Sequence, residues 1–588
     1  MKPIRCTTFF LSLALFLVLA LPAQAVRAER HDFTFFQGTQ YPLTVAFLKG
    51  AGDGPTIMVQ GGIQGDESSG FITAQLLSLA HVRKGNLIVV PRANVPSIHV
   101  HKRQVNVDMN RRFDQEYNRF YEDRVARVIR YLLGRSDALV HLHEGSGFYD
   151  PVWKSAMRNP KRYGQSIIID TLTFGKLHLG NTANEVLKEV NADIADPDYH
   201  FRLFNTKTFV PGTDYPEMRK SLTCYALSAC NIPAFAVEVS KDIRQIGWKV
   251  NQQLKTTVHL LRKLGVDVDL PVFTDDEIAT YAARDVRVRV NGHELRAGQP
   301  LNIVPGATLK VDADDEGNQL RPALGVFASD RPGVNLLTAR RMVLEPFTTL
   351  ELRSDGSRIL DAPVHLSAPM PAAPKSSGPV FVCWLNGNPL FVRAGETLDA
   401  VIGDQLILEG VWGSNRNEIL NLKGFVANTV DNDGQDSGWE IILDPDNFIS
   451  RYLEKSPDND ALRMRVARET PHEKHAEFFI DVHPRQVHAL RLADATGRRF
   501  LVPWTADGDY RLPEGEYTYV DAWTNGAVDK LIPIADSTPL SPGQRFRVTH
   551  GERTPLQLHS ATTFAPMGTM TFTPSTFAMR EDPAQLTR

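Results

Sequence analysis

The sequence predicts an α/β domain followed by all-β domains, and three observations support this fold class. From about residue 30 to residue 268, short apolar runs alternate with amphipathic stretches, which is typical of a sheet layered with helices. Beyond about residue 270, helical periodicity gives way to short alternating runs punctuated by Gly, Pro, Asp and Asn. Hydrophobic residues make up 42% and charged residues 23% of the 588 residues, so sizeable packed cores are expected.

Each element of the α/β half is predicted from its own pattern. Short apolar runs predict strands at residues 56–59, 87–90, 138–142, 166–169 and 234–239. Amphipathic stretches predict helices at residues 68–80, 122–133, 181–190 and 242–264. In the last helix, apolar residues such as Ile246, Val250 and Leu254 recur at helical spacing and share one face. We therefore expect one domain over residues 30–268.

The C-terminal half is predicted to contain further β domains. Two of its segments resemble each other, and each contains a favoured hairpin turn, Asn291-Gly292 in one and Asn386-Gly387 in the other. They predict related β-sandwich domains over residues 270–366 and 379–480, joined by a Pro-, Ala- and Ser-rich linker at residues 368–379. Residues 481–588 are expected to form a third β region.

Residues 1–25 have the pattern of a secretory signal peptide. Lys2 and Arg5 precede an apolar stretch of about 13 residues, and Ala23-Gln24-Ala25 follows it. An uncleaved membrane anchor is the less favoured alternative, because a span needs about 20 apolar residues. The sequence thus predicts export to the periplasm, with no membrane span after signal cleavage.

Charge and cysteine content restrict the partners and the metal chemistry. The 65 Lys+Arg and 68 Asp+Glu give a net charge of −3, without the basic excess typical of nucleic-acid binding. No Cys-x-x-Cys pair offers a thiolate metal site. Whether Cys224 and Cys230 form a disulfide is left open, as is the oligomeric state.

A Gly-rich turn after the first predicted strand carries candidate metal ligands. Gln64 and Glu67 leave this turn three residues apart, where oxygen donors on a rigid loop suit a divalent metal. The alternative is a tight connection without function. His141 and His143 favour the metal site, because they share one face at the end of an apolar strand, where α/β sheets bind ligands. Buried histidines bonded to backbone groups are the alternative.

Two further segments carry candidate catalytic and substrate-binding groups. Glu238 interrupts an otherwise apolar strand, and a buried carboxylate needs either a partner or a function. A general base is one such function, and an ion pair with an arginine of a neighbouring strand is the alternative. A cluster of side chains between residues 92 and 112 offers forked donors that suit a carboxylate: Arg92, Arg103, Asn110, Arg111 and Arg112. The alternative is that they only form a solvated basic loop.

Together these segments resemble the funnelin-type zinc carboxypeptidases of the carboxypeptidase A superfamily. The family pattern is His-x-x-Glu in a Gly-rich turn, then Asp-x-Asn-Arg, a strand-end His, and a Glu near the end of a later strand. The matching elements are Gln64-Gly-Asp-Glu67, Asp108-Met-Asn-Arg111, His143 and Glu238. The resemblance covers about residues 30–268 and implies a carboxypeptidase-like domain, with a mixed, twisted sheet flanked by helices.

Gln64 departs from this pattern, because most relatives have His there. The D,L-carboxypeptidases that trim peptidoglycan and control helical cell shape form a branch that this chain resembles more closely. That branch uses Gln-x-x-Glu and His as ligands and carries β domains after the catalytic domain. The resemblance implies Zn²⁺ bound by Gln64, Glu67 and His143, with His141 beside the site. Because the Gln carbonyl is neutral like imidazole, we expect zinc binding to be weaker but retained.

The resemblance also implies a mechanism and a substrate. A zinc-activated water would attack, Glu238 would move its proton to the leaving amine, and Arg103 would stabilise the oxyanion. The terminal carboxylate of the substrate would be held by Asn110 and Arg111, with Arg92 and Arg112 as helpers. The implied substrate is a peptidoglycan muropeptide, a tripeptide cleaved to a dipeptide between γ-D-Glu and meso-diaminopimelate.

Two alternatives stay open from the sequence. A non-catalytic cell-wall-binding relative with a vestigial zinc site would contain no zinc. An amidase or deacylase on the same fold would not need a carboxylate anchor, so Arg111→Ala would barely affect it. The preference for tripeptide or tetrapeptide and the ligands of the β domains are not predicted.

Overall fold

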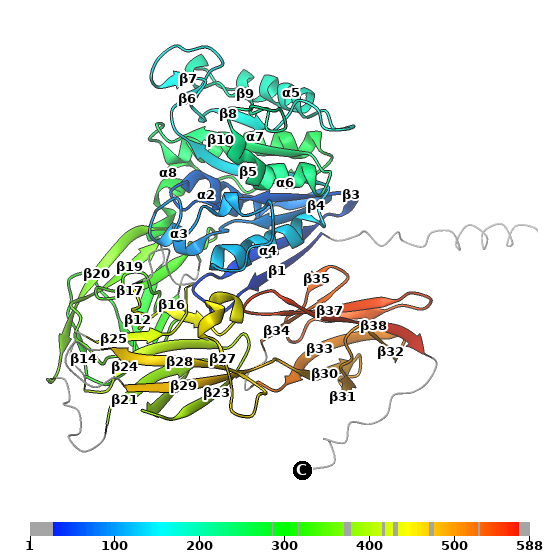
Figure 1. The fold of residues 1–588 in the computed structure, drawn as a ribbon. Helices are drawn as coiled ribbons and strands as arrows, with labels where there is room; N and C mark the ends of the chain where they lie inside the picture. Colours follow the sequence, from blue (N-terminus) through cyan, green and yellow to red (C-terminus); the bar gives the residue numbers. More distant parts are fainter. Residues whose placement is uncertain are drawn as a thin grey trace, which may run out of the picture.

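The computed structural model describes residues 28–284, 286–314, 317–369, 378–413, 418–426, 433–469, 476–526 and 530–575. The predicted signal peptide at residues 1–25 and most of the predicted linker at residues 368–379 lie outside the described residues. Figure 1 shows the α/β part at the top of the view and the β-rich part below it. Among the helices of the described residues, none has the length and apolar character needed to cross a membrane.

The N-terminal part contains a mixed sheet of nine strands. Its order is β1-β2-β4-β3-β5-β10-β8-β9, with β11 beside β4. Strands β3, β4, β5 and β10 pair in parallel, so their carboxyl ends meet at one edge of the sheet. The strand bounds are β1 Glu29–Phe35, β2 Leu43–Lys49, β3 Gly52–Gln60, β4 His81–Val90, β5 Ala138–Gly145, β8 Ser166–Ile169, β9 Arg202–Asn205, β10 Ala234–Ser240 and β11 Asp267–Asp269. A two-stranded sheet beside it pairs β6 Phe148–Tyr149 with β7 Arg158–Asn159.

Helices complete the α/β part and confirm the predicted fold class. The predicted helices correspond to α2 Ser68–Leu77, α4 Tyr121–Leu133, α5 Leu179–Ala192 and α7 Ile246–Lys263. Helix α7 packs against both α2 and α5, which forms one helical layer. The short helices α3 Val95–His99, α6 Leu222–Ser228 and α8 Asp275–Thr280 were not predicted. The central strands β5 and β10 are buried along their whole length, as parallel strands covered on both faces must be.

The β-rich part repeats one strand arrangement three times, which confirms its predicted all-β class. We define the first β module as residues 286–369, the second as residues 378–483 and the third as residues 487–575. In each, an early strand pairs in parallel with the last strand: β14 with β20, β23 with β29, and β32 with β38. The sequence indicated the kinship of the first two modules only. The predicted limits of the individual domains remain a proposal.

The strands of each module form two main sheets. The first module contains β12 Arg287–Val290, β13 His293–Glu294, β14 Leu301–Ile303, β15 Thr308–Leu309, β16 Val311–Asp314, β17 Leu324–Ala328, β18 Arg341–Met342, β19 Thr349–Ser354 and β20 Ser357–Leu366. The second contains β21 Val380–Leu385, β22 Asn388–Arg393, β23 Thr397–Val401, β24 Gln405–Val411, β25 Ile419–Leu422, β26 Glu440–Ile442, β27 Glu454–Lys455, β28 Leu462–Glu469 and β29 Ala476–His483. The third contains β30 Val487–Asp494, β31 Arg499–Pro503, β32 Gly508–Pro513, β33 Gly515–Thr524, β34 Leu531–Ala535, β35 Thr538–Pro539, β36 Arg545–Val548, β37 Thr554–Ser560 and β38 Pro566–Ser575.

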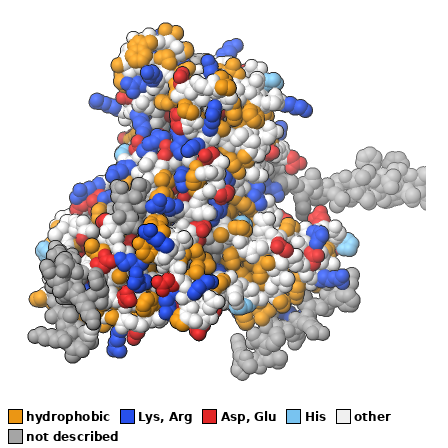
Figure 2. All heavy atoms as spheres, viewed as in Figure 1, with side chains coloured by type: hydrophobic (Ala, Val, Ile, Leu, Met, Phe, Trp, Pro, Cys, Tyr) orange, Lys and Arg blue, Asp and Glu red, His pale blue; other side chains and the backbone are white. Residues whose placement is uncertain are grey.

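The modules pack against the α/β part rather than trailing from it. The apolar core of the α/β part continues into the third module, where the ring of Phe564 lies 5.5 Å from Phe35 and 5.2 Å from Tyr131. Figure 2 shows basic and acidic side chains interspersed over the visible face, in keeping with the small net charge. The described cysteines Cys224, Cys230 and Cys383 are free thiols.

Candidate active site

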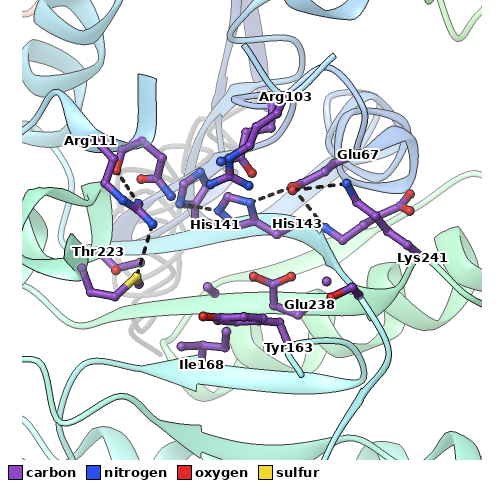
Figure 3. Close-up of a pocket in the computed structure, with 17 residues that line it drawn as sticks. Glu67, Arg103, Arg111, His141, His143, Tyr163, Ile168, Thr223, Glu238 and Lys241 are labelled. Carbon is purple, nitrogen blue, oxygen red and sulfur yellow. Dashed lines mark hydrogen bonds and ion pairs between the residues drawn. The ribbon is translucent and has the colours of Figure 1, made fainter. Parts of the chain in front are cut away.

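A cavity of about 330 Å³ opens at the carboxyl ends of the parallel strands. Figure 3 shows its lining side chains converging from several strands and loops. Eight of the residues singled out from the sequence line it: Gln64, Glu67, Arg103, Asn110, Arg111, His141, His143 and Glu238. Segments from four separate parts of the sequence thus meet in one pocket.

The turn that carries Gln64 and Glu67 is shaped by close backbone contacts. Strand β3 ends at Gln60, which is the cross-strand neighbour of His141 on β5, so the turn begins beside the two histidines. A Cβ at Gly65 would lie 2.1 Å from the carbonyl carbon of Ser97, so only glycine fits there. Glu67 occupies the N-cap position of α2. Glycine at position 65 therefore allows this turn to pack closely against the segment that contains Ser97.

Glu67 and His143 bind each other. Glu67 Oε2 lies 2.8 Å from His143 Nδ1 and accepts the backbone N–H of Glu144 at 3.2 Å. Burial acts to lower the pKa of His143, but the Glu67 carboxylate outweighs it and raises this pKa above its ordinary value. Burial, and next the charge of His143, lowers the pKa of His141 well below its ordinary value, so His141 is neutral.

Asp108 orients both Gln64 and Arg103. Its Oδ1 accepts Gln64 Nε2 at 3.2 Å, and its Oδ2 accepts Arg103 Nη2 at 2.7 Å. Burial acts to raise the pKa of Asp108, but Arg103 and then Arg111 hold it below its ordinary value, so Asp108 is a carboxylate. Because a carboxylate only accepts hydrogen bonds, the NH₂ group of Gln64 must face it. The Gln64 carbonyl oxygen is therefore turned to the other side.

The donor set of Gln64, Glu67 and His143 fits a divalent metal. A carbonyl oxygen, a carboxylate and a neutral imidazole nitrogen are ordinary zinc ligands or close equivalents of them. The short distance between His143 Nδ1 and Glu67 Oε2 shows that these two donor atoms converge on one point. Among the described residues, no three His, Cys, Asp or Glu side chains cluster as a metal site. A three-residue site here therefore requires the amide of Gln64.

Glu238 faces the same pocket from β10. It is the cross-strand neighbour of His143, and its carboxylate points into the cavity in Figure 3. Burial raises the pKa of Glu238 to about 7. Within the described part of the chain, no arginine or lysine forms an ion pair with it, contrary to the alternative raised from the sequence. Its position and pKa suit an acid-base group at neutral pH.

Asn110 and Arg111 form the opposite side of the pocket. Asn110 Oδ1 accepts the backbone N–H of Leu222 at 3.0 Å, which fixes the amide with its NH₂ group available as a donor. Arg111 donates from Nη1 to the carbonyl oxygen of Asn110 at 2.8 Å, and its Nη2 lies 3.8 Å from Met218 Sδ. None of the described carboxylates forms an ion pair with Arg111, so its guanidinium can still receive an anion.

Arg92 and Arg112 do not line the pocket, which corrects the prediction that they assist substrate binding. The Arg92 guanidinium points toward the first β module and binds Asp355 at 2.6 Å, and both side chains are buried. Arg112 donates to Asp123 of α4 at 2.6 Å and stacks 3.5 Å from the centre of the Tyr117 ring. Both guanidinium groups are thus already neutralised by internal partners.

Several lining residues were not predicted from the sequence, among them Lys241 and Tyr163. Lys241 donates to Asp66 at 2.6 Å and lies 4.0 Å from Glu67, and its position three residues after Glu238 was the available signal. Tyr163 lies below Glu238 in Figure 3 and comes from a loop without any recognisable pattern.

Comparison with known proteins finds a match over the part of the chain that contains this site. Residues 43–274 match a family model described as the catalytic part of carboxypeptidases controlling helical cell shape. A curated relative, the N-alpha-acetyl-L-2,4-diaminobutyric acid deacetylase of Halomonas elongata, is 30% identical over 127 residues, or 20% of this chain. The aligned segment spans only 36% of that relative.

Several solved structures match parts of this chain. The apo form of the cell shape determinant protein Csd4 from Helicobacter pylori is 22% identical, with a TM-score of 0.43, over 73% of this chain and 96% of that chain. The same values hold for the mDAP-bound form of Csd4, described as a D,L-carboxypeptidase. A metallo-carboxypeptidase from Burkholderia cenocepacia is 11% identical, with a TM-score of 0.28, over 41% of this chain and 64% of that one. The family match at residues 43–274 contains every residue that lines the pocket, so the part of the chain that forms this site is similar to the catalytic part of the carboxypeptidases that control helical cell shape.

Proposed function

We propose that the protein is a periplasmic zinc D,L-carboxypeptidase that acts on peptidoglycan stem peptides. It removes meso-diaminopimelate from a muropeptide tripeptide by hydrolysing the bond to γ-D-Glu, and leaves a dipeptide. The observation that carries this proposal is the composition of one pocket: a convergent donor set, an unpaired carboxylate and an unpaired guanidinium. The family of residues 43–274 supports the reaction class.

Gln64, Glu67 and His143 would hold the zinc ion, which when bound supplies Lewis acidity toward a carbonyl and lowers the pKa of water. Asp108 keeps the Gln64 amide turned so that its oxygen is free. Glu238, with a pKa of about 7, takes a proton from the attacking water and gives it to the nitrogen of the leaving amine. The carbon–nitrogen bond breaks as the water oxygen joins the carbonyl carbon, so the proton balance closes within the site.

The cationic residues give the site its preference for a C-terminal residue. Arg111 and the NH₂ group of Asn110 bind the terminal carboxylate of the substrate, because they are charged or polar donors without a competing carboxylate. Arg103 lines the same pocket and donates from Nε and Nη2 to Asp108, so its Nη1 group would stabilise the developing oxyanion. An amidase or deacylase on this fold would leave Arg111 without a role.

The proposal is tested with the purified protein, its zinc content quantified, and defined muropeptide tripeptides and tetrapeptides. Mass spectrometry of the products should show zinc-dependent release of diaminopimelate from the tripeptide. No zinc and no product would favour the cell-wall-binding alternative instead. Bound zinc without cleavage would indicate a different amide substrate, such as that of a deacylase. In that case, Arg111→Ala should leave hydrolysis of the true substrate unchanged.

A further inference from the structure

Among the contacts of the first β module with the α/β part is a tight hairpin turn that packs on α3. Asp355 and Gly356 join β19 to β20 with φ angles of 44° and 79°, as a two-residue Asp-Gly hairpin requires. A Cβ at Gly356 would lie 2.4 Å from the carbonyl oxygen of Ile98 at the end of α3. The turn therefore packs directly on α3, and only glycine permits this approach.

The buried carboxylate of Asp355 forms an ion pair with Arg92 of the α/β part. Its carboxylate accepts Arg92 Nε at 2.7 Å and Arg92 Nη2 at 2.6 Å, a two-point interaction in which the side chains are 2% and 8% exposed. The hydroxyl of Tyr281 and the backbone N–H of Ala323 also donate to it, at 2.5 and 2.9 Å. Asp355 thus collects four donors from three separate segments.

Arg92 also binds helix α2, and so connects Asp355 to that helix. Its Nη1 donates to Gln75 Oε1 at 2.8 Å, and its guanidinium lies 5.6 Å from the centre of the Phe71 ring. Both residues lie on α2, which begins directly after Glu67. The position of Asp355 is therefore linked, through Arg92, to the helix whose N-cap is the proposed metal ligand.

Helix α3 connects the first β module to Gly65, the residue that follows Gln64 in the turn. The backbone N–H of Gly65 points to Ser97 Oγ of α3 and to the carbonyl oxygen of Lys102, at 3.0 Å each. At its far end, α3 is held by the first β module, where Arg353 Nη1 donates to the carbonyl oxygen of His99 at 3.3 Å. The segment that bears Gln64 and Glu67 is thus enclosed between α2 and α3, and both helices are held by the same hairpin region.

We propose that Asp355 is a positioning residue for the metal-binding turn, so that the first β module completes the scaffold of the active site. Without its carboxylate, Arg92 loses its partner, α2 and α3 are no longer fixed relative to each other, and the turn between them loosens. The assignment of Gln64 and Glu67 as ligands rests on the proposed function. The enclosure of the turn does not.

The test compares Asp355→Asn with a matched control, Asp404→Asn, in the full chain. Asp404 forms an equally buried pair with Arg485, at 2.9 Å with side chains 5% and 2% exposed, and its hydrogen bonds lie within the β modules. Three quantities are measured: hydrogen exchange at residues 61–67, the zinc dissociation constant by chelator competition, and kcat and KM on the tripeptide.

Asp355→Asn should speed exchange at residues 61–67 and weaken zinc binding by about tenfold, as loss of groups that orient metal ligands does. At subsaturating zinc its kcat should fall, while KM changes little. Asp404→Asn should stay within about twofold of the wild type in all three. Tyr281→Phe, which removes only one donor, should change exchange and zinc affinity in the same direction by about threefold.

Exchange and zinc affinity that stay at wild-type values in Asp355→Asn would overturn the proposal, even if the protein became less stable. If Asp355→Asn does not fold, the same result in Tyr281→Phe overturns it. If the wild type binds no zinc, the proposed function fails, and the exchange comparison alone decides whether Asp355 fixes the turn. Equal effects in Asp404→Asn would also refute the inference, because they would mean a general loss of rigidity.

Discussion

Substituting Gly65 by alanine should separate the geometry of the metal-binding turn from its chemistry. The Cβ of alanine would lie 2.1 Å from the carbonyl carbon and oxygen of Ser97 and 2.3 Å from the nitrogen of Ile98, against the 3.4 Å of an ordinary contact. Because these are backbone atoms of α3, no side chain can rotate away, and the turn must move by about 1 Å. Every ligand residue stays in place in the sequence, so any loss comes from position.

A displacement of about 1 Å at a catalytic group costs about 100-fold in rate, or about 2.7 kcal/mol of transition-state stabilisation. We therefore expect kcat/KM of Gly65→Ala on the tripeptide to fall by about that factor, together with its zinc content. The overpacking should also lower the free energy of unfolding by about 1–3 kcal/mol. The assay is product release followed by mass spectrometry at fixed total zinc, with thermal unfolding followed by circular dichroism.

The matched control is Gly134→Ala at the end of α4. Its Cβ would lie 3.6 Å from the carbonyl oxygen of Arg130, an ordinary contact, and Gly134 already has helical dihedral angles. This variant should keep wild-type activity. Wild-type activity and zinc content in Gly65→Ala would refute the reasoning, because the turn would then tolerate a displacement that we expect to disrupt the site.

Three further predictions concern single side chains. Glu238→Gln should retain zinc but lose about 10²- to 10⁴-fold in kcat on the tripeptide, and activity near that of the wild type would exclude Glu238 as the base. Arg111→Lys should raise KM by about tenfold with a smaller change in kcat, because a point charge replaces a forked donor, whereas an unchanged KM would mean that no carboxylate binds there. Burial raises the pKa of Glu122 in α4 to about 7 in the folded protein, so its contribution to stability is full below pH 4.5 and is lost as the pH rises through 7. The unfolding free energy of the wild type should thus decline by up to about 3 kcal/mol across that window, and Glu122→Gln should decline less. Parallel pH profiles in urea unfolding would contradict the assignment.

The parts of the fold that local pattern determines could be predicted from the sequence. Strands β5 and β10 were predicted because continuous apolar runs encode strands buried on both faces. The edge strand β1 and its neighbour β2 were missed, because partly exposed strands mix polar and apolar residues. Helix α3, with five residues, is too short for periodicity to show. The third β module has the strand order of the other two, but the turn between its first two strands lacks the Asn-Gly pair that the other two modules carry there.

The candidate site divides in the same way. The sequence could indicate that Gln64, Glu67, His143 and Glu238 lie in one pocket, because each follows or interrupts an apolar segment and such positions are visible in a sequence. Arg92 was misassigned because its partner, Asp355, lies 263 residues later, and no local pattern reports an ion pair across that separation. Tyr163 was missed because only the path of its loop brings it to the pocket, and no local pattern in the sequence indicates that path.

The contact of Phe35 with Phe564 has a consequence for how the chain folds. Phe35 belongs to the first described strand, yet its ring meets a partner that is synthesised more than 500 residues later. If the α/β part folds during synthesis, the apolar surface around Phe35 and Tyr131 stays open until the third module has been made, and the core is unfinished until then. Nascent chains that stop before residue 564 should therefore expose this surface to chaperones and aggregation, and truncation of the last module should be costlier than its distance from the pocket suggests.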